Sequence, residues 1–296
     1  VISNPTKNDI TNISDSTASF NVIISSDGNS KITAKGVCWN TTHNPTIANN
    51  KTANISTNLS FIVNISGLNP NTTYYARVYA TNDIGTVYSD EVSFITSTVT
   101  DIDGNVYNTI TIGNQVWMQE NLKVTHFRNG DLIPEQKDSS GWCCNDYKPA
   151  SWCYYNNDST NNAIYGKLYN WTSVMDYGNG RTIAPIGWHV PTVAEWQTLN
   201  TYLGGGAVAG GALKATTLWN NPNTGATNSS GFTAYPAGRI IIRTFYDKGY
   251  FTYFWTSTNY GNGSNPFSMN LCNDCVSVGF SEQYPSSGFS VRCIKD

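Results

Sequence analysis

The sequence predicts a mainly β protein with two domains: a β-sandwich over residues 1–98, and an α+β domain with two short helices over residues 99–296. Three observations lead to this fold class. Residues 7–97 alternate short apolar segments with turn signals and show no helical periodicity. The pattern resets near residue 98 without a long flexible linker. Two segments with helical spacing then give way to glycine, asparagine and aromatic residues.

The first domain contains a local signature of a sandwich corner, Leu68-Asn69-Pro70-Asn71-Thr72-Thr73-Tyr74. Leu, Pro, Thr and Tyr at this spacing resemble the corner of a fibronectin type III domain, where the Tyr hydroxyl bonds to upstream backbone. Strand alternation then assigns residues to faces. We expect Tyr74, Ala76, Val78 and Ala80 to point inward, and Tyr75, Arg77 and Tyr79 to point outward.

The second domain opens with β-hairpins. Asp103-Gly104 and Gly113-Asn114 are turn pairs, and the second pair separates the alternating segments 106–112 and 115–118. Oxygen ligands for calcium from Asp101, Asp103 and Asn105 are an alternative interpretation. The later carboxylate that closes a calcium loop is missing, so the sequence favours a plain turn and leaves a weak calcium site open.

Two helices are predicted after these hairpins. The first covers residues 167–175, with Leu168, Trp171 and Met175 on one face. The second begins at about Val193, because Thr192 and Glu195 have the spacing of a capping box. Its apolar face continues to Leu203, and Gly204 follows as a stop signal.

Composition limits the class of partner. Only 12% of the 296 residues are charged and the net charge is −3, so no basic patch for nucleic acid is present. The longest apolar runs are far below the roughly 18 residues that a membrane span needs. The start at Val1 lacks a basic, apolar leader and reads like a mature or trimmed product.

The cysteines indicate an oxidising compartment and therefore export. Six of the seven fall in the second domain, and an even, clustered set favours disulfides. A four-cysteine zinc site is a weaker alternative, because two of its ligands would be adjacent. We expect Cys38 to be a small buried residue in a strand. The disulfide candidates are Cys143, Cys144, Cys153, Cys272, Cys275 and Cys293.

Several short sequence motifs of the second domain occur together in one family. They include 165–171 (YGKLYNW), 187–196 (GWHVPTVAEW) and 288–293 (GFSVRC). With these motifs, residues 99–296 resemble the Fibrobacter succinogenes major paralogous domain, which looks like a C-type-lectin-like relative of the formylglycine-generating enzymes. The resemblance implies a lectin-like layout of two short helices and an irregular, loop-rich sheet.

The resemblance also implies roles for cysteines. Cys153 and Cys293 both lie in sequence motifs that resemble those of the family. We therefore expect them to form a disulfide that joins the C-terminal strand to the segment before the first helix. The related enzymes use a redox-active cysteine pair near the C-terminus. Cys272 and Cys275 offer the nearest pair, but their spacing differs and Asn273-Asp274 looks like a two-residue hairpin turn. The pairing of Cys143, Cys144, Cys272 and Cys275 is left open.

No catalytic arrangement emerges from the remaining polar residues. His43, His126 and His189 are scattered without metal-binding spacing, and Glu195 is explained as a helix cap. The shared helix-start motif therefore predicts fold rather than activity. We expect no enzyme, cofactor or metal site.

Recognition is the better-supported class of function. Aromatic and asparagine side chains stand beside predicted loops, and such surfaces bind glycans or proteins. A core position is an equal alternative for Trp219. The candidate ligand or interface residues are Trp219, Asn221, Tyr246, Tyr250 and Tyr260.

The sequence thus predicts a secreted or cell-surface, non-enzymatic bacterial protein that acts through protein or glycan contacts. It would self-associate as the subunit of an extracellular fibre or surface assembly, or act as an adhesive module. A monomeric carbohydrate-binding protein is the alternative, and an enzyme of the formylglycine-generating type is a remote one. Ser16 and Ser159 lie in Asp-Ser-Thr triplets that resemble the O-glycosylation motif of secreted proteins in bacteria that carry this family.

Overall fold

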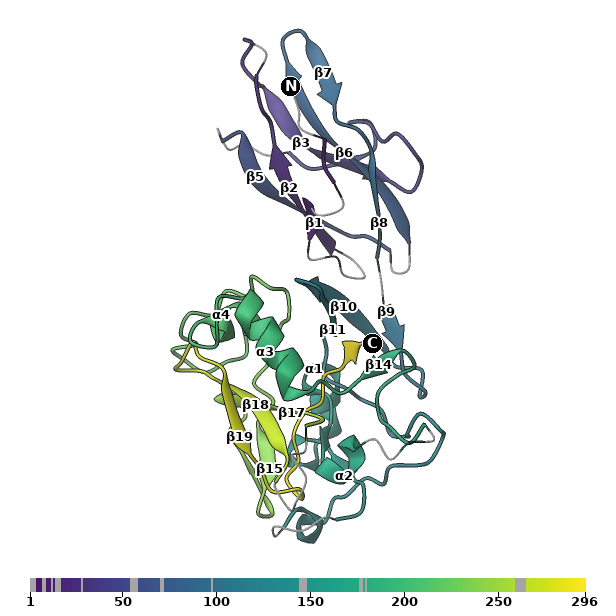
Figure 1. Cartoon of the computed structure of the whole chain (residues 1–296), viewed down its shortest axis with the longest axis vertical. Coiled ribbons are helices and arrows are strands. Elements are labelled where there is room, and N and C mark those ends of the chain that lie inside the picture. The colour runs from purple at the N-terminus through teal and green to yellow at the C-terminus, as the bar shows by residue number, and fades with distance from the viewer. Residues whose placement is uncertain are drawn as a thin grey trace. The chain divides into compact units, whose positions relative to one another are not determined.

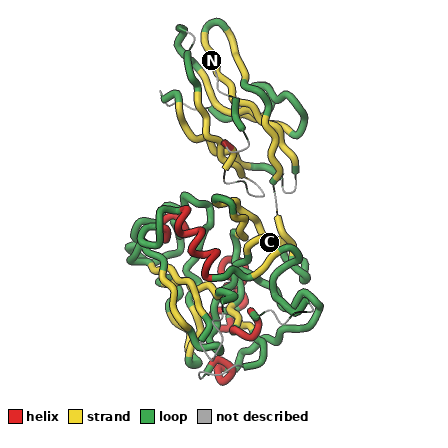
Figure 2. The backbone as a smooth tube through the Cα atoms, in the orientation of Figure 1, coloured by secondary structure: helices red, strands yellow, loops and turns green. Residues whose placement is uncertain are grey.

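The computed structural model describes residues 4–6, 9–11, 13, 17–27, 29–53, 58–69, 72–96, 98–143, 148–175, 178, 180–258 and 265–296. The chain divides into two compact units, Val1–Thr98 and Val99–Asp296 (Figure 1). Strands dominate the first unit, whereas loops make up much of the second (Figure 2). The fold is mainly β with a few short helices, as the sequence predicts.

The first unit contains two antiparallel sheets. One has the order β1-β2-β5, and the other has the order β4-β3-β6-β7, with β8 also pairing with β6. The strands are β1 (Ile10–Thr11), β2 (Thr17–Ile23), β3 (Ala34–Asn40), β4 (Asn50–Lys51), β5 (Ser60–Ser66), β6 (Thr73–Asn82), β7 (Gly85–Tyr88) and β8 (Val92–Ile95). One core cluster contains side chains of both sheets, including Phe20 of β2 and Val78 of β6. This is the packing of a sandwich.

The predicted corner is present. The hydroxyl of Tyr74 accepts a hydrogen bond from the backbone N–H of Asn69 at 2.9 Å. Tyr74, Ala76, Val78 and Ala80 are all buried, as the alternation predicts.

Tyr79 and Cys38 are also buried in this unit. Tyr79 was expected on the outer face but is only 3% exposed, because its hydroxyl donates to the carbonyl of Thr52, which belongs to a segment that covers this part of β6. Cys38 is a buried free thiol, as expected. Burial raises the pKa of Cys38 to about 11, so it is an unreactive thiol at neutral pH.

The second unit is built on a five-stranded sheet of order β14-β20-β11-β10-β9. Its strands are β9 (Thr98–Thr100), β10 (Val106–Ile112), β11 (Gln115–Met118), β14 (Trp188–His189) and β20 (Ile294–Lys295). β10 and β11 form the predicted hairpin, in which Ile112 pairs with Gln115. β20 lies between β14 and β11, so residues near the end of the sequence complete the sheet.

A second antiparallel sheet and two short ribbons complete the strands of this unit. The sheet consists of β17 (Phe251–Trp255), β18 (Phe267–Cys272) and β19 (Gly279–Glu282), and the ribbons are β12 (Trp152–Cys153) with β13 (Leu168–Tyr169), and β15 (Arg239–Ile241) with β16 (Thr244–Tyr246). An aromatic core packs Trp117 against Trp196, with ring centroids 4.5 Å apart, and both rings against Phe232.

The helices of the second unit are short. They are η2 (Ser139–Trp142), η3 (Tyr155–Asn157), η4 (Ser159–Asn161), α1 (Asn162–Tyr165), α2 (Trp171–Val174), α3 (Val193–Tyr202) and α4 (Ala209–Leu213). α3 is the predicted capped helix, and both hydrogen bonds of its capping box are present. The predicted helix over residues 167–175 is largely wrong, since only Trp171–Val174 is helical. Leu168 and Tyr169 instead pair with Cys153 and Trp152 in a ribbon.

The expected bridge between Cys153 and Cys293 is also wrong, because both are free thiols in the structure. Cys153 packs in a small cluster with Trp142, Leu168 and Ile240, whereas Cys293 is buried in the larger core of the unit. Burial raises the pKa of both thiols. Each cysteine therefore acts as a small core residue.

Candidate functional site

Three loops of the second unit are joined by hydrogen bonds at Asn273. They comprise residues 216–225, 247–250 and 273–278, and we call them the Asn273 loops. The Asn273 N–H donates to the carbonyl of Tyr250 at 2.8 Å, and its carbonyl accepts from the Thr224 N–H at 2.7 Å. Its side-chain amide donates to the carbonyls of Asn220 and Asn221, at 3.3 and 3.0 Å. One buried residue thus fixes all three loops.

A glycine permits the close approach of two of these loops. Gly249 has a positive φ of 89°, and a Cβ at this position would lie 2.7 Å from the side chain of Asn220. The Asn220 N–H donates to the Gly249 carbonyl at 2.8 Å. A larger residue at 249 would therefore strain the backbone and displace the side chain of Asn220.

Lys214 supports the loops from within. Its Nζ donates to the carbonyls of Thr224, Cys272 and Cys275, at 2.9, 2.9 and 2.7 Å. The side chain is fully buried, and burial lowers its pKa while Asp274 opposes that change. Sequence reasoning missed Lys214 and Asn273. The available signal was Lys214 directly after the apolar segment Gly210-Gly211-Ala212-Leu213.

A disulfide joins Cys272, the last residue of β18, to Cys275 in the loop of residues 273–278. The expected two-residue hairpin turn at Asn273-Asp274 is wrong, because the last ladder pair of β18 and β19 is Asn270 with Gly279. The connection is therefore a longer loop that the disulfide closes at one end. Its closure restricts the loop that carries Asn273.

The outward-facing side chains of the Asn273 loops are polar and aromatic. Tyr250 is 51% exposed, and Asn220 and Asn221 are exposed beside it. Tyr246, at the end of β16, is 45% exposed. The next residue, Asp247, forms an ion pair of 2.7 Å with Arg239 of β15.

Trp219 is a core residue, not a surface ligand residue. It is only 8% exposed, and its indole N–H donates to the carbonyl of Ala234 at 2.9 Å. Its ring belongs to the same core cluster as Trp117, Trp196 and Phe232. Tyr260, the last candidate of this group, lies outside the described residues.

The three histidines contact acidic side chains. His43 lies 2.7 Å from Glu91 and His126 lies 2.6 Å from Asp103. His189 contacts both Glu195 and Asp296 at 2.7 Å. In each case an acidic partner accounts for the histidine.

The acidic residues considered for calcium make local bonds. The carboxylate of Asp101 accepts from the backbone N–H groups of Asp103 and Asn105 and from the hydroxyl of Tyr107 at 2.6 Å. Asp103 accepts from Thr125 and contacts His126. Over the described ranges, one group of potential metal ligands occurs, Cys272, Asp274 and Cys275, and its two sulfur atoms are joined to each other.

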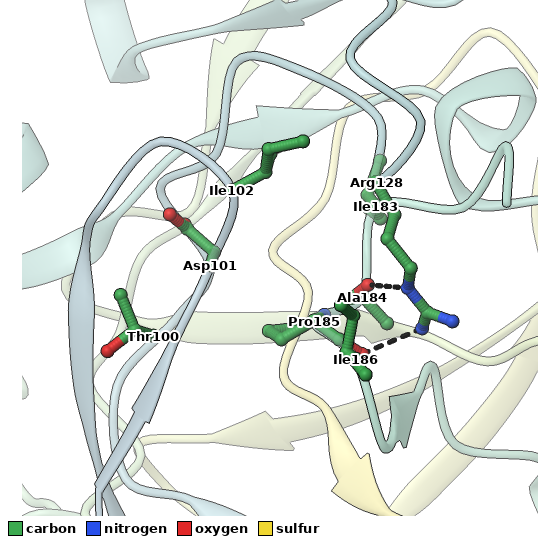
Figure 3. A pocket seen from close by; sticks show the side chains of 8 residues that line it. All are labelled: Thr100, Asp101, Ile102, Arg128, Ile183, Ala184, Pro185 and Ile186. Carbon is green, nitrogen blue, oxygen red and sulfur yellow. Dashed lines mark hydrogen bonds between the residues drawn. The ribbon is translucent and has the colours of Figure 1, made fainter.

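A small pocket of about 170 Å³ lies elsewhere on the second unit, between Thr100-Asp101-Ile102 and residues 183–186 (Figure 3). Arg128 borders it, but its guanidinium donates to the carbonyls of Ala184, Pro185 and Trp188, at 2.9, 2.7 and 2.8 Å. Ile102 and Ile186 are 49% and 83% exposed and give the pocket an apolar part, beside polar lining from Thr100 and Asp101.

The structure describes some of the remaining residues that the sequence predicts as sites. Ser159 is exposed in η4, where its backbone follows the capping residue Asp158. Ser16 and Cys144 lie outside the described residues. The sulfur of Cys143 is buried and lies 3.6 Å from Nη2 of Arg243.

Comparison with known proteins identifies relatives of both units. The profile of the Fibrobacter succinogenes major domain matches residues 110–295, and that of the fibronectin type III domain matches residues 3–95. No curated protein matches the chain. Among the described residues, no helix combines the length and apolar character required to cross a membrane.

Three solved structures are similar to parts of this chain. The sixth fibronectin type III domain of human fibronectin type III domain containing protein 3 is 23% identical, with a TM-score of 0.24 and coverage of 32% of this chain and 83% of that one. The FN1-FN3 domains of chicken CNTN1 are 19% identical, with a TM-score of 0.26 and coverage of 32% and 33%. The twitchin kinase region from C. elegans is 12% identical, with a TM-score of 0.22 and coverage of 62% and 31%.

Proposed function

Because this chain belongs to the Fibrobacter succinogenes major domain family and carries a fibronectin type III domain before it, we propose that it is an exported, non-enzymatic bacterial surface protein. It acts through contacts with a protein or glycan, as an adhesive module or as the subunit of an extracellular assembly. Both domain types are typical of surface and adhesion proteins.

The observation that carries this proposal is the arrangement of the Asn273 loops. Hydrogen bonds from Asn273 hold the loops of Tyr250 and Asn221 together, so their exposed side chains form one surface that is ordered before any ligand arrives. A tyrosine ring stacks on apolar faces of sugars or side chains, and neighbouring amides supply hydrogen bonds. Because the surface is already ordered, binding would cost less conformational entropy.

The test compares two exposed tyrosines. The wild-type chain, Tyr250→Ala and Tyr202→Ala are applied to a glycan array and to the surface of the producing cells. Tyr202 is 63% exposed but lies on α3, so it is the matched control. Weaker capture by Tyr250→Ala alone supports the proposal, and equal capture by all three chains contradicts it.

A second candidate, self-association into a fibre, is favoured by the rim of the small pocket. Ile186 at 83% exposure and Ile102 at 49% present apolar surface to solvent, and such groups mark association surfaces when they lie together. A contact between this rim and a different surface of the next copy would extend without closing.

Sedimentation and electron microscopy test this candidate. Ile186→Ser should reduce the fraction of assembled material, whereas Leu132→Ser, at a residue of 63% exposure outside the pocket, should not. A wild-type chain that stays monomeric and binds a glycan array would leave the carbohydrate-binding alternative. Formylglycine formation on a cysteine-containing substrate peptide would instead support the remote enzymatic alternative.

A further inference from the structure

Lys214 follows α4 and carries the most completely buried ammonium group near the Asn273 loops. The side chain is 0% exposed, and its Nζ lies 2.7 to 2.9 Å from the three carbonyl oxygens of Thr224, Cys272 and Cys275. An ammonium group has three N–H donors and no acceptor. Three carbonyls therefore satisfy it completely.

Two of these carbonyls belong to the loops, and that of Cys272 belongs to the last residue of β18. Thr224 belongs to residues 216–225, while Cys272 and Cys275 are the two ends of the disulfide-closed segment. Carbonyl oxygens that converge on one point repel each other unless a cation lies between them. Proteins commonly solve this problem with a bound metal ion, whose ligands are often backbone carbonyls.

The position is suited to a charged group despite its burial. A buried ammonium requires partners that replace its hydration, and here three dipoles do so. The ring of Trp219 adds an aromatic face 5.5 Å from Nζ, and the carboxylate of Asp274 acts on the ammonium through its charge.

We propose that Lys214 is a positioning residue whose ammonium group takes the place of a bound metal ion and orders the Asn273 loops. The surface of Tyr250 and Asn221 is then independent of calcium and insensitive to chelators. Loop order can be measured without any ligand, so a negative result here is distinguishable from a failure of the proposed function.

Hydrogen exchange in the full chain tests the proposal. The amides of Thr224 and Asn273 are suitable probes, because each donates across the loops, to the carbonyls of Asn273 and Tyr250. In Lys214→Met, which keeps the apolar stem and removes the charge, exchange at both amides should rise about tenfold or more. In Lys214→Ala the rise should be similar, and ethylammonium chloride should reverse it where sodium chloride of equal ionic strength does not.

Lys167→Met is the matched control. Lys167 is also buried, but its Nζ donates to the carbonyl of Lys123 and lies 4.6 Å from the Trp152 ring. This variant should leave exchange at Thr224 and Asn273 unchanged. Wild-type exchange in Lys214→Met, no reversal by ethylammonium in Lys214→Ala, or an equal effect of Lys167→Met would each overturn the proposal.

A measurement on the wild-type chain covers the case in which the variants do not fold. Nitrogen-15 spectra should show a slowly exchanging Lys214 NH₃⁺ signal with couplings across hydrogen bonds to the carbonyl carbons of Thr224, Cys272 and Cys275. The signal should persist after dialysis against a chelator. Absence of these couplings, or loss of loop protection on chelation, would contradict the proposal.

Discussion

Glu195 binds His189 and caps α3 with the same carboxylate. Its Oε1 lies 2.7 Å from Nε2 of His189, while its Oε2 accepts from the backbone N–H and the hydroxyl of Thr192, at 2.7 and 2.8 Å. The other ring nitrogen of His189 lies 2.7 Å from Asp296. Strand β14, helix α3 and the residue that follows β20 are thus joined through one imidazole, and this junction gives the first two predictions.

The stability of the second unit should depend on the charge of His189. Burial disfavours that charge, but the hydrogen bonds to Asp296 and Glu195 outweigh it and raise the pKa of His189. A raised folded pKa means that the contribution is complete below the unfolded value of about 6.5 and is lost as pH rises through the folded pKa. Melting temperatures of wild type and His189→Gln should therefore differ most in acid and converge in alkali. A constant difference would contradict this.

Removal of the Thr192 hydroxyl should destabilise α3. The hydroxyl accepts from the Glu195 N–H at 3.2 Å, so Thr192→Ala should lower the free energy of unfolding by about 1 kcal/mol. Thr192→Ser keeps the cap and should remain close to wild type. Urea denaturation measures both, and loss of binding or assembly at unchanged stability would assign Thr192 to the function instead.

The corner of the first unit gives a prediction with an adjacent control. Tyr74→Phe removes the acceptor for the Asn69 N–H and should lower the free energy of unfolding by about 1 kcal/mol. Tyr75→Phe leaves this bond intact and should have little effect. A probe that is specific to the first unit monitors its denaturation and distinguishes the two variants.

Substitution of Trp219 should affect stability, whereas substitution of Tyr250 should affect recognition. Trp219→Ala removes a buried ring with a satisfied N–H and should destabilise the second unit by about 3 to 5 kcal/mol. Tyr250→Ala should change stability by less than about 0.5 kcal/mol. If Tyr250 is a hot spot, the same change weakens binding by about 2 kcal/mol or more. Paired measurements of unfolding and ligand capture test both halves.

Thiol mapping should find different states among the cysteines. Alkylation of the unfolded, unreduced chain should modify Cys38, Cys153 and Cys293, and should leave Cys272 and Cys275 joined. Peptide mass spectrometry provides the readout. A peptide pair that links Cys153 to Cys293 would contradict the structure.

The elements that the sequence predicted correctly depend on short-range chemistry. The capping box needs Thr192 and Glu195, three residues apart, and the corner needs Asn69 and Tyr74, five residues apart. Contacts at this range follow from local geometry, so a single sequence reveals them. The family resemblance extended the prediction to the second unit, where residues 110–295 match the family profile.

The errors involve contacts between distant segments. Leu168 fits a helical face, but pairing with Cys153 places it in a strand. Tyr79 alternates outward, but the segment at Thr52 covers it. The partner of a buried thiol and the three carbonyls around Lys214 depend likewise on tertiary placement, which residue spacing does not encode.

The position of β20 has a consequence for how the protein is made. Ile294 pairs with Trp117 on one side and with His189 on the other, so β11 and β14 meet only through this strand. A nascent chain that ends before residue 294 lacks the strand that joins β14 to β11, and it leaves the facing edges of those two strands unpaired. The ribosome must therefore finish almost the whole second unit before that sheet can close.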